Sequence, residues 1–299
     1  MNVATSAERG GDNRLQTLLS KLCDKSRDTI YDVHTVFDWP DQLPPDRYLM
    51  SETLLSVYGT GFGADLDHAQ KVALSRAESL NFYSLNIHGI RDLLTEVLRR
   101  IHSPNYVEIS EYLHHFVDEE NKHMWMFAHL CTRYLGEIYP DKRLAFGEQP
   151  SPKVNDFVVF ARIQLFEELV DYYNTQMAQD ESLPQLLRDI NRVHHVDESR
   201  HIGFGRELVA ALHHDIRRTL GTSELAELES YLKRYLVACV QSLYNPNAYR
   251  DAHLPYNAYE LRRRLLNDPV RLQMHADMLR RPMSFYMRHG IFESEGLPA

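Results

Sequence analysis

The motif His194-x-x-x-Glu198-x-x-His201 constrains the fold of this chain more than any other stretch. At about 3.6 residues per turn, its three side chains share one face of an α-helix. That face continues into four positions without charge: Ile202, Gly205, Val209 and Leu212. Two imidazoles and a carboxylate on a buried face are costly unless they bind a cation, and a metal ion is the usual one. The motif therefore predicts a metal site. The alternative is an interior helix whose polar side chains bond to neighbouring groups.

A second pair with the same spacing, Glu120-x-x-His123, lies on another predicted helix. Its face is apolar: Leu113, Phe116, Val117, Met124, Phe127 and Leu130. The adjacent Glu119 falls on the side of Tyr112 and Lys122, so we expect it to be solvated. Two Glu-x-x-His pairs on separate apolar helix faces are typical of carboxylate-bridged di-iron or di-manganese four-helix bundles. Together the two motifs favour a di-metal centre.

Hydrophobic periodicity predicts an all-α chain, with no segment that reads as a confident strand. The predicted helices span residues 14–35, 51–58, 65–101, 107–138, 155–179, 183–214 and 224–243. Residues 157–161 are apolar nearly all round, which predicts a buried helix. The glycines at 59–63 are expected to break the second helix, and residues 140–152 to form a loop. After residue 243 the prolines at 246, 255 and 282 predict short helices and connections.

The expected organisation is a disordered polar tail over residues 1–14 and a single helical domain over residues 15–299. The core bundle is expected at about residues 65–214. The chain of 299 residues, 43% of them hydrophobic, suffices for one large core. A net charge of −9 without a dense basic patch argues against a nucleic-acid partner.

No run of residues approaches the ~20 apolar positions of a membrane span, and the N-terminus lacks the apolar core of a signal peptide. The three cysteines, Cys23, Cys131 and Cys239, are far apart, which argues against a disulfide framework. We therefore expect no membrane partner and a cytoplasmic location.

The other two core helices should each supply a carboxylate. On the third core helix the candidates are Glu167 and Glu168. Glu167 is favoured because it shares a face with apolar residues such as Phe160 and Val170, and Glu168 stays an alternative.

On the first core helix the ligand is unresolved. If the turn at residues 103–105 makes the first two core helices antiparallel, the position level with Glu120 is about Ile90. His88 lies within one turn of that height, so we expect it beside the metals, as a ligand or one water away. Glu78 is three turns beyond, and it could bind metal only if the two helices pair very unevenly.

These stretches resemble the p-aminobenzoate N-oxygenase family of di-iron proteins. The residues that carry the resemblance are Leu113 to His123, Phe166 to Asp171 and His194 to His201, and it covers roughly residues 51–214. It implies six metal ligands: Glu120, His123, Glu167, His194, Glu198 and His201. His194 would be a third histidine ligand. The family also has a glutamate on the first core helix, where this sequence reads Asn86-Ile87-His88-Gly89-Ile90-Arg91.

With the motifs, the resemblance implies an all-α, ferritin-like four-helix bundle core with additional N- and C-terminal helices. It implies a di-iron monooxygenase, with manganese as the alternative metal, that activates O2 to N-oxygenate an amine in specialised metabolism. The substrate class is an arylamine or an amino-acid-derived amine, and an external electron donor is expected, as is a homodimer. Beyond the ligands no catalytic residue is assigned, although Arg91 and Arg162 could pair with a substrate carboxylate.

Other activities compete with this one. They are a C–H hydroxylase, a radical-generating subunit, a ferroxidase-like storage protein and a metal-binding helical protein with a degraded site.

Overall fold

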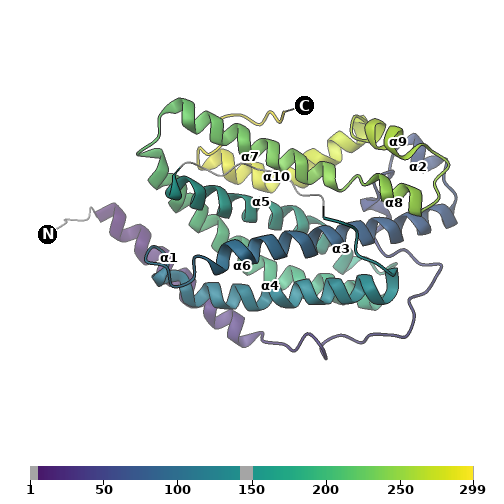
Figure 1. The fold of residues 1–299 in the computed structure, drawn as a ribbon, viewed down its shortest axis with the longest axis horizontal. Coiled ribbons are helices and arrows are strands. Elements are labelled where there is room, and N and C mark those ends of the chain that lie inside the picture. Colours follow the sequence, from purple (N-terminus) through teal and green to yellow (C-terminus); the bar gives the residue numbers. More distant parts are fainter. Residues whose placement is uncertain (1–5, 142–150, 299) are drawn as a thin grey trace.

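The computed structural model of the protein describes residues 6–141 and 151–298. Every regular element in these ranges is helical, which confirms the predicted all-α class. Four long helices form the core bundle (Figure 1): α3 (His68–Leu98), α4 (Ser110–Leu130), α5 (Pro152–Gln179) and α6 (Gln185–Arg217). Residues 99–109 join α3 to α4, and residues 180–184 join α5 to α6, so each pair is antiparallel.

Local chemistry sets the ends of these helices. The Asp67 side chain accepts a hydrogen bond from the backbone N–H of Gln70, whose own side chain accepts from the backbone of Asp67, so a capping box begins α3. A proline occupies the first position of α5, where its missing N–H costs nothing. After α4 the helix continues as a π-helical turn, Cys131–Leu135. This helical segment ends at Gly136, whose φ of +88° suits glycine.

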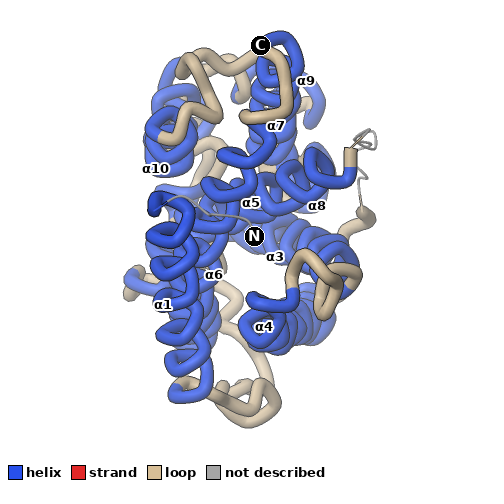
Figure 2. Tube along the Cα trace, turned by 90° about the vertical axis from the view of Figure 1, so that its left-hand side faces the viewer, coloured by secondary structure: helices blue, strands red, loops and turns tan. Residues whose placement is uncertain are grey.

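Further helices cover the bundle from two sides (Figures 1 and 2). On one side, α1 (Ser6–Asp28) packs against α4 and α6. On the other, α7 (Thr222–Ser242) and α10 (Pro269–Arg288) pack against α5. Two short helices, α8 (Pro246–Asp251) and α9 (Ala258–Leu265), pack on each other, and α8 also packs on α3. The structure thus confirms a four-helix core with additional N- and C-terminal helices.

Several boundaries differ from the predictions. α1 begins at Ser6, inside the segment expected to be a disordered tail, while residues 1–5 lie outside the described residues. Over residues 51–58 only a 3-10 turn forms, Glu52–Leu54, and the glycines that were expected to break a helix contribute to α2 (Gly61–Ala64). Most of the loop expected at residues 140–152 also lies outside the described residues.

The C-terminal region is the largest difference, because α10 is a helix of 20 residues that continues through Pro282. Proline removes one backbone hydrogen bond from a helix. Here the residues around it pack into the core: Met278, Leu279, Met283, Phe285 and Tyr286 are buried, and the Tyr286 hydroxyl donates to the Ala161 carbonyl of α5. Tertiary packing therefore stabilises a helix that the local sequence argues against.

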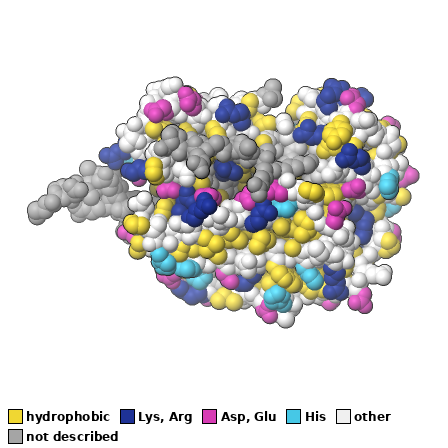
Figure 3. Space-filling view, viewed as in Figure 1, with side chains coloured by type: hydrophobic (Ala, Val, Ile, Leu, Met, Phe, Trp, Pro, Cys, Tyr) yellow, Lys and Arg dark blue, Asp and Glu magenta, His cyan; other side chains and the backbone are white. Residues whose placement is uncertain are grey.

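The interior matches the expected apolar pattern. Residues 157–161 of α5 are all buried, as predicted from their apolar run. On the face of the molecule drawn in Figure 3, acidic, basic and hydrophobic side chains are interspersed. Among the described residues, no helix is long and apolar enough to cross a membrane.

Candidate metal centre

The structure brings the six ligands implied by the resemblance into two groups in the bundle interior. One group is His123, His194 and Glu198, and the other is Glu120, Glu167, Glu198 and His201. Within each group the potential ligand atoms lie within 4.8 Å of one another. Glu198 belongs to both groups, so two metal ions held there would share its carboxylate.

The six side chains are at most 3% exposed, and their inward-facing atoms have no hydrogen-bond partner among the described residues outside the two groups. Within the groups, Nδ1 of His201 lies 2.8 Å from Glu120 and Nε2 of His194 lies 2.7 Å from Glu198. These atoms are both carboxylate oxygens of Glu120 and of Glu167, Oε2 of Glu198, Nδ1 of His123, Nε2 of His194 and Nδ1 of His201. Buried polar atoms are rarely left unpaired, because each costs roughly 1–3 kcal/mol. Oxygen and imidazole donors without thiolate suit iron or manganese. The residues present therefore fit a di-metal centre.

Each motif supplies the carboxylate that orients the other motif's histidine. Nε2 of His123 lies 2.9 Å from Asp197, one position before Glu198. Nε2 of His201 lies 2.8 Å from Glu119, one position before Glu120. When these carboxylates accept from the Nε2–H groups, both Nδ1 atoms keep lone pairs directed at the interior, as metal-bound histidines require.

Glu119 is therefore not the solvated residue that the sequence analysis expected. It is 5% exposed, and Nη2 of Arg200 joins it to Asp197 at distances of 2.7 and 2.5 Å. Burial alone raises the pKa of the Glu119 carboxyl, but its bond to His201 and the nearby charges lower the pKa overall. The helical wheel placed Glu119 off the apolar face of α4, and packing of α6 covers that side with Arg200.

Two further residues that sequence analysis missed complete the surroundings of the centre. The Tyr31 hydroxyl, from the segment after α1, donates to Asp197 at 3.0 Å. The side-chain amide of Asn174 on α5 lies 2.8 Å from Nδ1 of His194. Neither residue carried a signal in the sequence, because both contacts join separate elements.

The neighbouring His195 points elsewhere. Its Nδ1 lies 2.6 Å from Asp171, and its side chain is 36% exposed, whereas the side chain of His194 is 1% exposed. This difference agrees with the helix phase that the sequence analysis assigned to the motif.

The charges of the centre also favour a bound cation. Burial, and then repulsion from Glu198, raise the pKa of the Glu167 carboxyl well above its usual value. Burial lowers the pKa of His123, but its bonds to Asp197 and Glu120 raise it to about 10 overall. Burial and repulsion thus favour a proton on the Glu167 carboxyl, and metal cations would offset the same repulsion.

The two alternative glutamates lie outside both groups. Glu168 accepts two hydrogen bonds from Arg206, at 2.8 and 2.7 Å, and one from Gln164. Glu78 accepts from the backbone N–H of Ser56 at 3.0 Å and from the Ser56 hydroxyl. Geometry therefore favours Glu167 over Glu168 as the ligand from α5, and it places Glu78 away from the centre.

The prediction that His88 lies beside the metals is wrong, because the side chain of His88 points in another direction. The antiparallel pairing of α3 and α4 on which that prediction rested is present. The rings of Tyr83 and Phe127 lie 5.1 Å apart, which is the antiparallel register that sets Ile90 level with Glu120. His88 belongs to neither ligand group; its Nε2 lies 2.8 Å from the Tyr139 carbonyl oxygen. It is rotated by about 160° around the helix from Ile90 and so faces away from the bundle interior.

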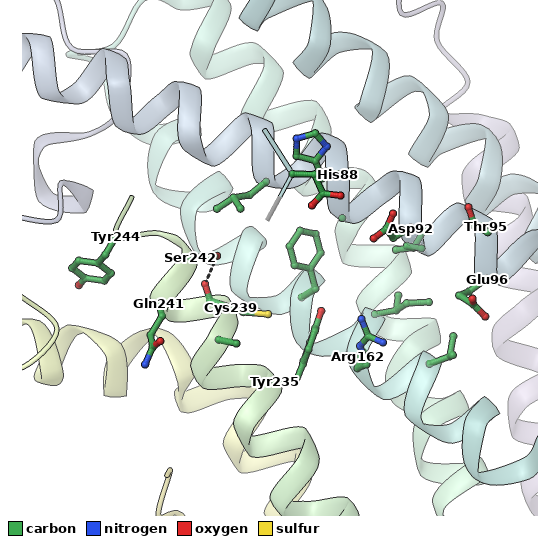
Figure 4. Close-up of a pocket in the computed structure, with 18 of the residues that line it drawn as sticks. His88, Asp92, Thr95, Glu96, Arg162, Tyr235, Cys239, Gln241, Ser242 and Tyr244 are labelled. Carbon is green, nitrogen blue, oxygen red and sulfur yellow. Dashed lines mark hydrogen bonds between the residues drawn. The ribbon is translucent and has the colours of Figure 1, made fainter. Parts of the chain in front are cut away.

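His88 instead borders a cavity of about 640 Å³ between α3, α5 and α7 (Figure 4). The cavity lining carries charges of both signs, including Asp92, Arg162 and Arg262. Phe166 also lines it, one position before the candidate ligand Glu167. This cavity has a volume typical of small-molecule sites. Sequence analysis did not find it, because α7 forms one wall.

Comparisons with known proteins identify the family of the chain. The model of the p-aminobenzoate N-oxygenase family matches residues 12–290. No match was found among curated proteins. Solved structures that match include an R2-like ligand-binding oxidase variant with an anaerobically reconstituted Mn/Fe cofactor, 17% identical with a TM-score of 0.49, over 87% of this chain and 93% of that chain.

A second variant of that oxidase, with an aerobically reconstituted Mn/Fe cofactor, is 17% identical with a TM-score of 0.48, over 87% of this chain and 96% of that chain. The family model spans most of the sequence, including every candidate ligand. The chain therefore belongs to the p-aminobenzoate N-oxygenase family and is an oxygenase.

Proposed function

We propose that this oxygenase holds two iron ions and N-oxygenates a small-molecule amine, either an arylamine or an amino-acid-derived amine. One observation carries the proposal: two groups of buried candidate ligands share Glu198, and their inward-facing atoms have no partner among the described residues outside the two groups. Manganese suits the same donors and is the alternative metal. Family membership supports the oxygenase chemistry and the choice of an amine.

When bound, the metal pair supplies the reduction of O2 and the transfer of one oxygen atom. The protein orients the ligands and keeps water out. Asp197 and Glu119 hold His123 and His201 through their outer nitrogens. Aromatic rings close the site: Phe116 lies 4.4 Å from the ring of His201, and Phe127 lies 4.9 Å from the ring of His194. A dry site of this kind strengthens electrostatic interactions and limits side reactions.

The cavity between α3, α5 and α7 is the proposed substrate-recognition site. None of the six candidate ligands lines it, so we place the reacting amine at the wall formed by Phe166, next to Glu167 in the sequence. Arg162, whose guanidinium lies 4.8 Å from the centre of the Tyr235 ring, would attract a carboxylate, and Asp92 would attract an ammonium group. Arg91, the other candidate partner of a carboxylate, bonds to Asp92 and to Asp141. The mixed charge of the lining favours a substrate that carries both an amine and a carboxylate.

The overall reaction balances as R–NH2 + O2 + 2 e⁻ + 2 H⁺ → R–NHOH + H2O. An external donor supplies the two electrons. With hydrogen peroxide in place of O2 and the donor, it becomes R–NH2 + H2O2 → R–NHOH + H2O.

The test is reconstitution with Fe(II), followed by reaction with ¹⁸O2 and a reductant, or with peroxide. The panel contains p-aminobenzoate, a primary alkylamine and α-amino acids. We expect a labelled hydroxylamine from one class, and its loss in Glu198→Gln. Labelled oxygen on carbon would identify a C–H hydroxylase. Rapid Fe(II) oxidation with no oxygenated product from any amine would contradict the proposal.

Tyr112 favours a second candidate function, the generation of a protein radical. It is 1% exposed, its hydroxyl has no hydrogen-bond partner within the described chain, and burial raises its pKa. His201, Glu119 and Glu167 lie close enough to influence that pKa. With O2 as the oxidant and its reduced form as the proton acceptor, loss of one electron and one proton would give a neutral tyrosyl radical. Its EPR signal after O2 exposure, absent in Tyr112→Phe, would support this function.

A further inference from the structure

One buried oxygen on α3 has no role in the structure described so far. Asn86 is 1% exposed, and its Nδ2 donates to the Phe82 carbonyl of its own helix at 2.8 Å. Its Oδ1 has no hydrogen-bond partner within the described chain. A buried amide oxygen left unpaired is costly, so an acceptor in this position indicates a missing partner.

The neighbours of Asn86 on α3 show that its side chain lies on the interior face. Phe82, four residues earlier, stacks on Tyr173 of α5 with ring centres 4.9 Å apart. Tyr83, three residues earlier, accepts a hydrogen bond from Asn191 of α6 at 2.8 Å. Side chains three and four residues apart lie on the same side of a helix. Asn86 therefore faces the space between α5 and α6.

The height of Asn86 follows from the directions of the helices. Glu119 contacts His201 and His123 contacts Asp197, so residue numbers rise along α4 as they fall along α6, and these helices are antiparallel. Because α3 is also antiparallel to α4, α3 and α6 run in parallel. Moving three residues onward along both helices from the Tyr83–Asn191 contact therefore reaches Asn86 and His194.

The contact with α4 gives the same height independently. The rings of Tyr83 and Phe127 lie 5.1 Å apart on antiparallel helices. Three residues onward from Tyr83 is Asn86, and three to four residues back from Phe127 is Met124 or His123. Both neighbouring helices thus place Asn86 level with the group formed by His123, His194 and Glu198.

We infer that the side-chain oxygen of Asn86 is the α3 donor to the metal held by His123, His194 and Glu198. The inference rests on the proposed di-metal function. Amide and carbonyl oxygens bind hard cations, manganese among them. The amide is neutral, so this site carries one negative charge fewer than it would with a carboxylate. The second site, with Glu120, Glu167 and Glu198, is richer in carboxylates. The two metals therefore bind with unequal affinity, and the weaker one lies beside Asn86.

Metal binding alone tests the inference. Anaerobic titration with Fe(II) followed by calorimetry, and with Mn(II) followed by EPR, should resolve a tight and a weak site in the unaltered protein. Asn86→Leu should weaken the weak site by ~10-fold or more and leave the tight site unchanged. Asn86→Glu should tighten the weak site, because it restores a charged oxygen donor.

Asn81→Leu is the matched control. Asn81 is a buried asparagine on the same helix, but its amide donates to the Ser242 carbonyl at 3.1 Å, outside the bundle. We expect this variant to keep both metal affinities. If it shifts the weak site as Asn86→Leu does, the effect is general destabilisation and the inference is overturned.

Circular dichroism checks that each variant folds. If Asn86→Leu is folded and binds both metals within about threefold of the unaltered protein, the inference is wrong. If Asn86→Leu does not fold, Asn86→Glu decides: a tighter weak site supports the inference, and unchanged or weaker binding overturns it. Failure of the unaltered protein to bind any metal would instead refute the proposed function, so the two failures are distinguishable.

Discussion

Glu119 and Asp197 each precede a candidate metal ligand, and each bonds to the histidine of the opposite motif. If the Nε2 atoms of both histidines carry protons, these bonds leave both Nδ1 lone pairs directed at the centre. Arg200 bonds to both carboxylates, so its single charge balances part of theirs. At the scale of the residue, the centre therefore depends on the positions beside the two motifs as much as on the motifs.

His194 and His195 offer a direct test of the helix phase. His194→Ala should lower bound metal to about one ion per chain, because it removes a nitrogen from one of the two ligand groups. His195→Ala should leave metal content unchanged, since the His195 side chain is 36% exposed and contacts Asp171, which belongs to neither ligand group. Elemental analysis after Fe(II) reconstitution measures both. Equal losses in the two variants would contradict the assignment of His194.

Glu78 predicts a pH dependence of stability. Burial raises the pKa of its carboxyl to about 7, although Ser56 and Arg271 oppose the shift. The folded state therefore holds the proton of the Glu78 carboxyl more tightly than the unfolded state does. The contribution of this proton to the free energy of unfolding is fully present below about pH 4.5 and is lost as the pH rises to about 7. The loss is about 3 kcal/mol.

Glu78→Gln should remove this part of the pH dependence of the free energy of unfolding, measured with urea at several pH values. Glu227→Gln, at an exposed position on α7, is the control and should leave the curve unchanged. A Glu78→Gln protein whose stability still falls between pH 4.5 and 7 as in the unaltered chain would argue against the raised pKa.

At the scale of the element, the direction of each helix face decides which side chains reach the centre. The register between α3 and α4 sets the height of α3 side chains, and the rotation of α3 then sends Asn86 inward and His88 toward the cavity. Close packing also decides where glycine is required. A Cβ atom on Gly63 of α2 would lie 2.3 Å from the Val57 carbonyl oxygen, whereas one on Gly61 would meet nothing within 4 Å.

Gly63→Ala should therefore destabilise the fold by roughly 1–3 kcal/mol, because the backbone of Val57 must move. Gly61→Ala is the matched control in the same short helix, and it should be neutral or stabilising by up to ~1 kcal/mol. Urea unfolding measures both. Equal changes in the free energy of unfolding for the two substitutions would show that the close contact between residue 63 and the Val57 carbonyl does not determine the loss of stability.

At the scale of the whole molecule, the metals should contribute to stability, since their ligands come from α4, α5 and α6. We expect about two metal ions per chain after reconstitution. Each should stabilise the fold by about 2.7 kcal/mol at a free concentration of 100 times its Kd.

Glu198→Ala should abolish most of this stabilisation, because Glu198 belongs to both ligand groups. Thermal unfolding with Fe(II) and with a chelator provides the measurement. An unchanged Tm on metal addition to the unaltered protein, with no bound metal, would contradict the metal centre itself.

The sequence alone determined the helical class, the core bundle and the two motifs, because these depend on periodicity within a single helix. The spacing of His194, Glu198 and His201 sets their shared face wherever the helix packs. Contacts between helices were decided only by the tertiary structure. The bond of Glu119 to His201, the outward direction of His88 and the cavity walled by α7 depend on how each helix is rotated against its neighbours. That rotation minimises exposed apolar area and unpaired polar groups over the whole core, so no local stretch of sequence specifies it.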